Sequence, residues 1–362
     1  MFNTTLRRTG SAIVIALLGA GLAAVPAHAT PGLFGSQDAT YDGVYRQSLV
    51  IAGLRDAHVA VPTSAVAWLE AQQCADGGFQ SLRTDTSKPC TLPDPANYVG
   101  EDTNSTAAAA FALASLGDKA RAAKAVTYLR KAQNKDGGIP YYAGGDSDVN
   151  STAMAMLGFK ANGVRSAAVR RGDYSIIDYL GTAAVGCDGT ARTRGGLGYM
   201  VSKPNMVSDM ATVQALAALS AKVPWMQHSR NLLRNTPQPT LRCPGSLSDN
   251  EATLRSVVAG YTARELAANN NLIPNAYGPG SDITSSAWAV IGLAGANLAG
   301  VQGTATDIAI RMGAKAYVFD SKGNANAGRA GVLLMVAVSR GDKPTSFGGI
   351  NLIATVLGTL GS

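Results

Sequence analysis

The chain has 362 residues, of which 46% are hydrophobic, 15% are charged and 6% are aromatic. Its formal net charge is +7, and no block of lysine and arginine carries interleaved aromatic residues, which argues against nucleic acid as a partner. With three histidines, four cysteines and no CxxC pair, neither a metal site nor a cofactor is expected.

Residues 1–29 have the layout of a secretory signal peptide. Arg7 and Arg8 give a basic start, an apolar stretch follows, and Ala27 and Ala29 form a small-x-small cleavage motif before Thr30. In residues 30–362, no apolar run approaches the ~18 residues that a membrane span needs. We therefore expect a protein that is secreted or held in the cell envelope, with residues 30–362 forming a single domain.

The four cysteines are an even number in a chain with a secretory leader, which predicts disulfides. Three pairings are possible. We favour Cys74 with Cys90 and Cys187 with Cys243, because each bond would clamp a glycine- and proline-rich insertion.

An internal repeat determines the predicted fold. Residues 65–79 (AVAWLEAQQCADGGF) align without gaps on residues 125–139 (AVTYLRKAQNKDGGI), and residues 176–186 form a weaker third copy. Each copy reads as a helix that ends at a glycine turn, since glycine tolerates the left-handed conformation that a helix end requires.

A second family of segments alternates with these copies. Each member begins with an acidic residue and a Ser/Thr pair, which suit a helix start, and continues as a run of alanines and larger apolar residues. Such nearly apolar helices belong inside other helices. The members are residues 102–117, 146–159, 208–221 and 281–296, to which residues 45–59 and 326–341 can be added.

The amphipathic set also reaches six members. The three repeat copies are followed by residues 254–270, 304–319 and 350–361, although residues 225–235 compete for the fourth place. Alternating buried and amphipathic helices without a β period predict an all-α protein, an (α/α)6 toroid in which each helix pair contacts mainly its neighbours.

The Q-x-x-D-G-G turns at Gln73–Gly78 and Gln133–Gly138 resemble the repeats of the terpenoid cyclase and protein prenyltransferase superfamily of toroids. That superfamily also includes the helical domain of intrinsic factor and transcobalamin-type vitamin carriers. The resemblance implies the toroid fold, and it implies a choice among acid catalysis, zinc-dependent prenyl transfer and ligand carriage.

Cyclase chemistry of the squalene-hopene type implies a D-x-D-D-T-A motif whose central Asp protonates an alkene. Residues 148–153 align with that motif, but Asn150 and Ser151 stand where the two central carboxylates belong, and residues 102–107 make the same substitution. A divergent cyclase would have to use Asp146 or Asp148 as its acid. Because Asp102, Asp148 and Asp282 recur at equivalent helix starts, we interpret all three as helix caps.

Two further activities, zinc-dependent prenyl transfer and polysaccharide cleavage, can be judged by whether the residues that each needs are present. The prenyltransferase zinc needs Asp, Cys and His ligands, and His58 and His228 lie far from any Asp-x-Cys pattern. A secreted polysaccharide-active enzyme would draw its two carboxylates from Glu101, Asp102, Asp146 and Asp148, with Tyr141 and Tyr142 as stacking platforms. The low aromatic content disfavours such a cleft.

If the buried helices run parallel, their starts open at one mouth. This mouth would be a funnel with a polar rim. The predicted ligand-binding residues are Asp102, Asn104, Asp146, Asp148, Asn150, Asp209, Asp282 and Thr284, joined by Tyr141, Tyr142 and Tyr199 from the loops. Trp288 and the two Asp-Gly-Gly turns are expected to be core and scaffold. The sequence thus favours a non-catalytic binding protein for a small or mid-sized molecule, or for a second secreted or envelope protein.

Overall fold

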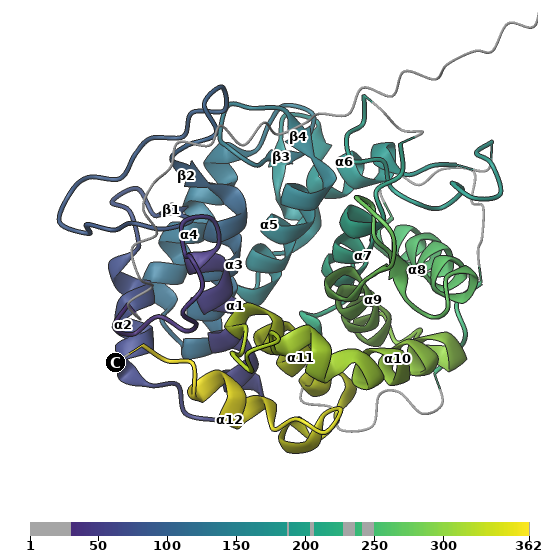
Figure 1. Ribbon diagram of the computed structural model, residues 1–362. Coiled ribbons are helices and arrows are strands. Elements are labelled where there is room, and N and C mark those ends of the chain that lie inside the picture. Colours follow the sequence, from purple (N-terminus) through teal and green to yellow (C-terminus); the bar gives the residue numbers. More distant parts are fainter. Residues whose placement is uncertain (1–29, 187, 203–205, 227–235, 241–249, 362) are drawn as a thin grey trace, which may run out of the picture.

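The computed structural model describes residues 30–186, 188–202, 206–226, 236–240 and 250–361. Its twelve α-helices alternate along the chain between an inner and an outer set (Figure 1). The inner helices are α1 (Gly43–Asp56), α3 (Thr103–Leu116), α5 (Val149–Ala161), α7 (Asp209–Ala218), α9 (Ile283–Gly295) and α11 (Ala327–Arg340). The outer helices are α2 (Thr63–Ala71), α4 (Lys119–Ala132), α6 (Ile176–Ala183), α8 (Glu251–Ala268), α10 (Gly300–Val318) and α12 (Leu352–Leu357).

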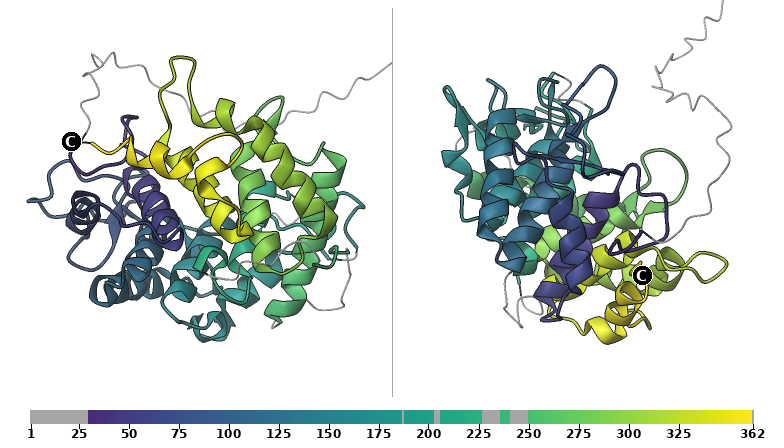
Figure 2. Two further views of the ribbon diagram at one scale, coloured as in Figure 1. Left: turned by 90° about the horizontal axis from the view of Figure 1, so that it is seen from below. Right: turned by 90° about the vertical axis from the view of Figure 1, so that its left-hand side faces the viewer.

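The inner helices form a closed ring. Each of them packs against the next, and α11 returns to pack against α1 (Figures 1 and 2). The predicted (α/α)6 toroid is therefore confirmed. Helix α8 also confirms residues 254–270 as the fourth outer helix, while the competing segment begins with a 3-10 turn, η2 (Pro224–Met226), and otherwise lies outside the described residues.

Small residues let the inner helices approach one another closely. Ala107 to Ala110 of α3 are fully buried, and a Cβ added at Gly158 of α5 would lie 3.1 Å from the carbonyl oxygen of Ala107. A Cβ at Gly292 of α9 would lie 2.8 Å from the backbone nitrogen of Ala217 in α7. The hydrophobic core thus lies between the two rings of helices and at the helix-to-helix seams.

Short antiparallel ladders join the two helix sets, a feature that the sequence pattern did not predict. Each ladder has two residues per strand, too few to show an alternating period. The pairs are β1 (Phe79–Gln80) with β2 (Glu101–Asp102), β3 (Ile139–Pro140) with β4 (Ser147–Asp148), β5 (Arg170–Arg171) with β6 (Tyr174–Ser175), and β7 (Ile273–Pro274) with β8 (Ser281–Asp282). Three of them tie the exit of an outer helix to the start of the next inner helix.

The two Asp-Gly-Gly turns are scaffold, as predicted. In the first turn, Gln73 donates to the carbonyls of Gly77 and Arg121 at 3.2 and 3.0 Å, and Asp76 accepts from the N–H of Gly78 at 3.0 Å. The second turn repeats this pattern with Gln133, Asp136 and Gly138. Each turn therefore fastens one outer helix to the next repeat.

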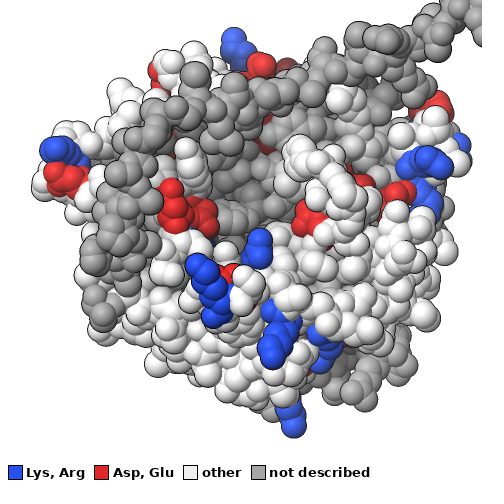
Figure 3. Space-filling model, viewed as in Figure 1, with Lys and Arg blue, Asp and Glu red and all other residues white. Residues whose placement is uncertain are grey.

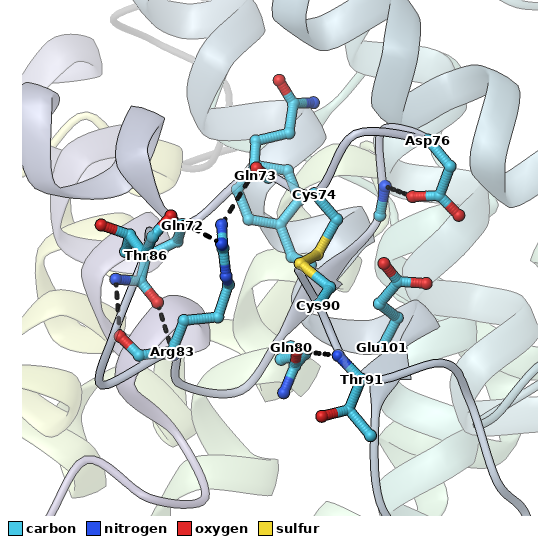
Figure 4. Close-up of a disulfide and its surroundings, with 12 residues drawn as sticks. Gln72, Gln73, Cys74, Asp76, Gln80, Arg83, Thr86, Cys90, Thr91 and Glu101 are labelled. Atoms are coloured by element: carbon cyan, nitrogen blue, oxygen red, sulfur yellow. Dashed lines mark hydrogen bonds between the residues drawn. A yellow bond between two sulfur atoms is a disulfide. The ribbon is translucent and has the colours of Figure 1, made fainter. Parts of the chain in front are cut away.

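The Cys74–Cys90 disulfide is present, as expected, and closes the loop after the first turn (Figure 4). Cys187 and Cys243 lie outside the described residues, as does the expected signal peptide. In the part of the chain that is described, no helix has the length and apolar character required to cross a bilayer.

One end of the ring is plugged by η2. Trp225 is fully buried, and its ring meets those of Phe111 from α3 and Trp288 from α9 edge to face, with centroids 5.1 and 5.9 Å away. The prediction that Trp288 belongs to the core is confirmed. Because Pro224 packs beside Gly295 at the last turn of α9, this plug lies at the C-terminal ends of the inner helices.

Candidate functional site: the mouth at the inner-helix starts

The acidic lead-ins cap the inner helices. One carboxylate oxygen of Asp102 accepts from the N–H of Ser105 at 2.6 Å, and Asp148 and Asp282 make the same bond to Ser151 and Ser285 at 2.7 and 3.0 Å. The capping interpretation is confirmed for all three. Helix α7 differs, because Ser208 is its cap and Asp209 is already its first residue.

A cavity of about 210 Å³ opens at the starts of α1, α3, α5 and α7. It brings together four residues that the sequence singled out: Asp102, Asn104, Tyr141 and Asn150. The other lining residues are Tyr41, Asp42, Tyr45, Ser105, Met154, Met210 and Gln214. We refer to this space as the mouth cavity.

Three side-chain amides form a ladder along the wall of the mouth cavity. The Nδ2 of Asn104 on α3 donates to the Oδ1 of Asn150 on α5 at 3.0 Å, and the Nδ2 of Asn150 donates to the Oε1 of Gln214 on α7. Gln214 is 6% exposed, and its Nε2 has no hydrogen-bond partner among the described residues. The ladder therefore ends in the side-chain N–H of Gln214, which can donate a hydrogen bond to a ligand.

The electrostatics of the mouth cavity are acidic to neutral. Burial raises the pKa of Asp102 to about 6, although the N–H and hydroxyl of Ser105 partly oppose that rise. Burial also raises the pKa values of Tyr45 and Tyr141. No lysine or arginine is among the described lining residues. Figure 3 shows acidic side chains on either side of the centre of the ring.

Several predicted residues lie outside the mouth cavity. Asp148 is buried as a cap, and burial raises its pKa to about 6, whereas Asp146 is exposed on the preceding loop. The hydroxyl of Tyr142 donates to the carbonyl of Tyr98 at 2.8 Å. Tyr199 is 41% exposed, and burial of the rest of its ring, followed by the charge of Asp148, raises its pKa to about 12.

The polar residues expected around the opening in the second half of the toroid lie apart from the mouth cavity. Tyr261 from α8 donates its hydroxyl to Asp209 at 2.6 Å, which holds that carboxylate toward the outer helices. Tyr317 from α10 likewise binds Thr284 at 2.7 Å. Asp282 and Thr284 consequently line a separate cavity of about 530 Å³ beside Tyr317.

Sequence reasoning missed seven of the lining residues. A usable signal existed for Gln214, which is an amide within the apolar run of a buried helix. Tyr41, Asp42 and Tyr45 carry no such signal, because they belong to the entry of α1, where no acidic Ser/Thr lead-in occurs.

A larger hollow of about 640 Å³ lies at the C-terminal ends of α5 and α7. Its basic lining residues are Lys160, Arg165, Lys222 and Arg255. Lys160 donates to the carbonyls of Ala218 and Ser220, at 2.6 Å each, and pairs with Glu251. Lys160 thereby caps the last turn of α7, so we assign this residue a structural role.

A scan of protein-family models matches none for this chain, and a search of curated proteins gives no significant match. Solved structures do match. Over 82% of this chain, ent-copalyl diphosphate synthase from Streptomyces platensis superposes with a TM-score of 0.52 at 14% identity; this chain spans half of that protein's length. Candida albicans protein geranylgeranyltransferase-I, complexed with GGPP, gives 0.51 at 14% identity over 88% of this chain and 89% of that chain. The chain therefore has the (α/α)6 toroid fold of terpene cyclases and protein prenyltransferases.

Proposed function

We propose that this chain is a non-catalytic, extracytoplasmic binding protein that holds a small polar molecule in the mouth cavity. The amide ladder is the observation that carries the proposal. Asn104 and Asn150 occupy the positions where the resemblance to cyclases calls for an acid, and they bond to each other instead. An amide has no proton to release at any relevant pH.

The acids near the mouth support binding rather than proton transfer. Asp102 lines the cavity, but a single carboxyl with a pKa of about 6 is a weak acid toward an alkene, and it holds the start of α3. The two fallback acids, Asp146 and Asp148, are an exposed loop residue and a buried cap.

The polysaccharide alternative also loses support. Its candidate Glu101 faces the Cys74–Cys90 disulfide rather than the mouth cavity (Figure 4). Its candidate Asp146 lies on an exposed loop, so these carboxylates do not flank one groove.

The size and lining of the cavity narrow the class of ligand. A volume of about 210 Å³ lies below the ~300 to 1,000 Å³ of sites for drug-sized molecules, which favours a compact ligand over a polyprenyl chain. The Nε2 of Gln214 can donate to an acceptor on the ligand, and the buried Oδ1 of Asn104, which has no hydrogen-bond partner among the described residues, can accept from a donor. Asp42 forms an ion pair with the buried Arg46 at 3.0 Å, and burial raises the pKa of Asp102, so the lining carries little net charge and favours a neutral ligand.

The extracytoplasmic location is part of the proposal. It is supported by the leader-like pattern of residues 1–29 and by the Cys74–Cys90 disulfide, since disulfides persist mainly in oxidising compartments.

Native mass spectrometry of the exported protein tests the proposal without assuming the ligand. We expect a small-molecule adduct on the wild type that is released by denaturation. Q214L, which removes the free donor, should lower occupancy about tenfold, since losing a buried hydrogen bond to a ligand costs about 1–2 kcal/mol. T284V is the control, because Thr284 lies two residues after the cap of α9, as Asn104 and Asn150 do on their helices, but lines a different cavity.

Two results would contradict binding at this site. One is equal occupancy of Q214L and the wild type. The other is a wild type that carries no adduct and shows no thermal shift with a panel of small polar metabolites, where ligand at one hundred times Kd should add about 2.7 kcal/mol.

A further inference from the structure

The Cys74–Cys90 disulfide lies beside a buried carboxyl group. The two sulfurs and a carboxylate oxygen of Glu101 all lie within 4.8 Å of one another. Glu101 is 2% exposed, and its Oε2 has no hydrogen-bond partner. Figure 4 shows the Glu101 side chain between the disulfide and Asp76. This cluster lies outside the mouth cavity and has no part in the proposed function.

The second Asp-Gly-Gly turn shows what the fold alone requires at this place. There, Ser147 stands at the ladder position of Glu101 and donates its hydroxyl to Asp136 at 2.8 Å. Asn134 stands at the position of Cys74 and donates to Ser147 at 3.0 Å. In that copy, the hydroxyl of Ser147 binds the aspartate, and the amide of Asn134 binds that hydroxyl. The fold therefore does not require the carboxyl group and the two sulfurs that the first turn has at these positions.

The added carboxyl is also electrostatically uncompensated. Burial, followed by the adjacent carboxylate of Asp76, raises the pKa of Glu101 to about 7, while Arg83 opposes the rise. Glu101 is buried while Asp76 is exposed, and a buried carboxylate beside a second acid destabilises the folded chain unless a cation or a proton compensates it.

We propose that, once the disulfide is reduced, Cys74, Cys90 and Glu101 bind a thiophilic divalent cation such as Zn²⁺. Two thiolates and one carboxylate are a ligand set that zinc accepts, with the fourth position left to water. Reduction by a phosphine in water breaks the S–S bond and gives two thiols and the phosphine oxide. The incoming cation then displaces the two thiol protons and any proton on Glu101.

The covalent bond and the metal exclude each other. In a tetrahedral zinc site with Zn–S bonds of ~2.3 Å, the two sulfurs lie roughly 3.8 Å apart, well beyond bonding distance. Cys90 is only half-buried, on the loop that the disulfide closes, so its sulfur has room to move from Cys74. The disulfide-bonded chain therefore cannot bind the cation at this site, whereas the reduced chain can.

The test uses the full mature chain, reduced with a phosphine, freed of reductant without oxygen and titrated with Co²⁺. We expect one equivalent to bind with thiolate-to-cobalt charge-transfer absorption, and Zn²⁺ to displace it. C74S/C90S, which keeps Cys187 and Cys243, should lose this band. E101Q should weaken Co²⁺ binding at least tenfold, whereas E265Q, which changes an acid on α8, should leave it unchanged.

Circular dichroism and the thermal midpoint confirm that each protein is folded. If a double variant unfolds, C90S alone serves, because it retains Cys74 and Glu101 and should still lose most of the charge-transfer intensity. The proposal is overturned if reduced wild type binds Co²⁺ no better than the cysteine variants, if E101Q binds as tightly as wild type, or if the oxidised protein binds equally well.

Discussion

At the scale of single residues, two of the three capping carboxylates are buried beyond what capping requires. Asp102 and Asp148 are 1% and 4% exposed, and burial raises the pKa of each to about 6. Asp282 makes the same cap in a more open place. A raised pKa in the folded state means that the folded chain binds protons more tightly than the unfolded chain.

This predicts a pH-dependent stability difference for D148N. The wild type should lose stability as the pH rises from about 4 through 6, by about 3 kcal/mol at Asp148, because the charged form is poorly solvated. Asparagine caps a helix comparably and does not ionise. Urea unfolding at pH 4 and pH 7 should therefore show D148N gaining on the wild type by up to that amount, and D282N gaining little. A D148N difference that is the same at both pH values would contradict the burial argument.

The candidate site was predictable only in part at this scale. Asn104 and Asn150 were found because they stand in a repeated lead-in, which fixes their place at a helix start. Gln214 could have been found as an amide within the apolar run of a buried helix, whereas Tyr45 could not, because the entry of α1 lacks the repeated lead-in. The hydrogen-bond partners of Asp209 and Thr284 come from outer helices far along the chain, so they could not be predicted from sequence spacing.

At the scale of elements, the glycine turns join one helix pair to the next. Gly137 has φ of +86°, and a Cβ there would lie 2.3 Å from the carbonyl oxygen of Ser175, the N-cap of α6. Gly144 has φ of +90° on the following loop but has nothing within 4 Å of such a Cβ. An alanine at either position would be strained by the positive φ, but only at Gly137 would its Cβ also clash with a neighbouring segment.

We expect G144A to lose about 1 kcal/mol from the left-handed backbone alone. G137A should lose roughly 2 kcal/mol more, because the clash must push α4 and α6 apart. Chemical denaturation of both variants against wild type measures the difference. Equal losses would mean that the turn is not a tight joint between the helices.

Helices were the most predictable elements. The gapless repeat and the capped apolar runs identified the inner and outer helices, and α8 appeared where the residues 254–270 pattern put it. The short ladders could not be foreseen. Their two-residue strands are defined by the pairing of distant segments, such as Phe79 with Asp102, and not by any local pattern.

At the scale of the whole molecule, the toroid is open at the helix starts and plugged at the helix ends. Trp225 is buried among rings from α3 and α9, and its Nε1 has no hydrogen-bond partner in the described part of the chain. The closed ring was foreseen from alternation of the helices, but this plug was not, since it lies in the insertion that breaks the repeat.

W225A should destabilise the protein by about 3–5 kcal/mol, because it empties a large volume at the junction of several helices. W225F should cost much less, since phenylalanine keeps most of the packing and removes a buried N–H that lacks a partner. Equilibrium unfolding of both variants tests this. A W225F loss as large as that of W225A would contradict the argument that ring packing, and not the indole N–H, stabilises this junction.

The seam between α1 and α11 determines when the toroid can be completed. When the chain is synthesised or exported from its N-terminus, α1 emerges long before α11, the helix that covers one of its sides. Contacts so remote in the chain form slowly, and the uncovered flank of α1 is apolar, so we expect the ring to close late in folding. The C-terminal helices therefore complete the ring. Truncations that remove α11 should leave the apolar side of α1 exposed and cause aggregation.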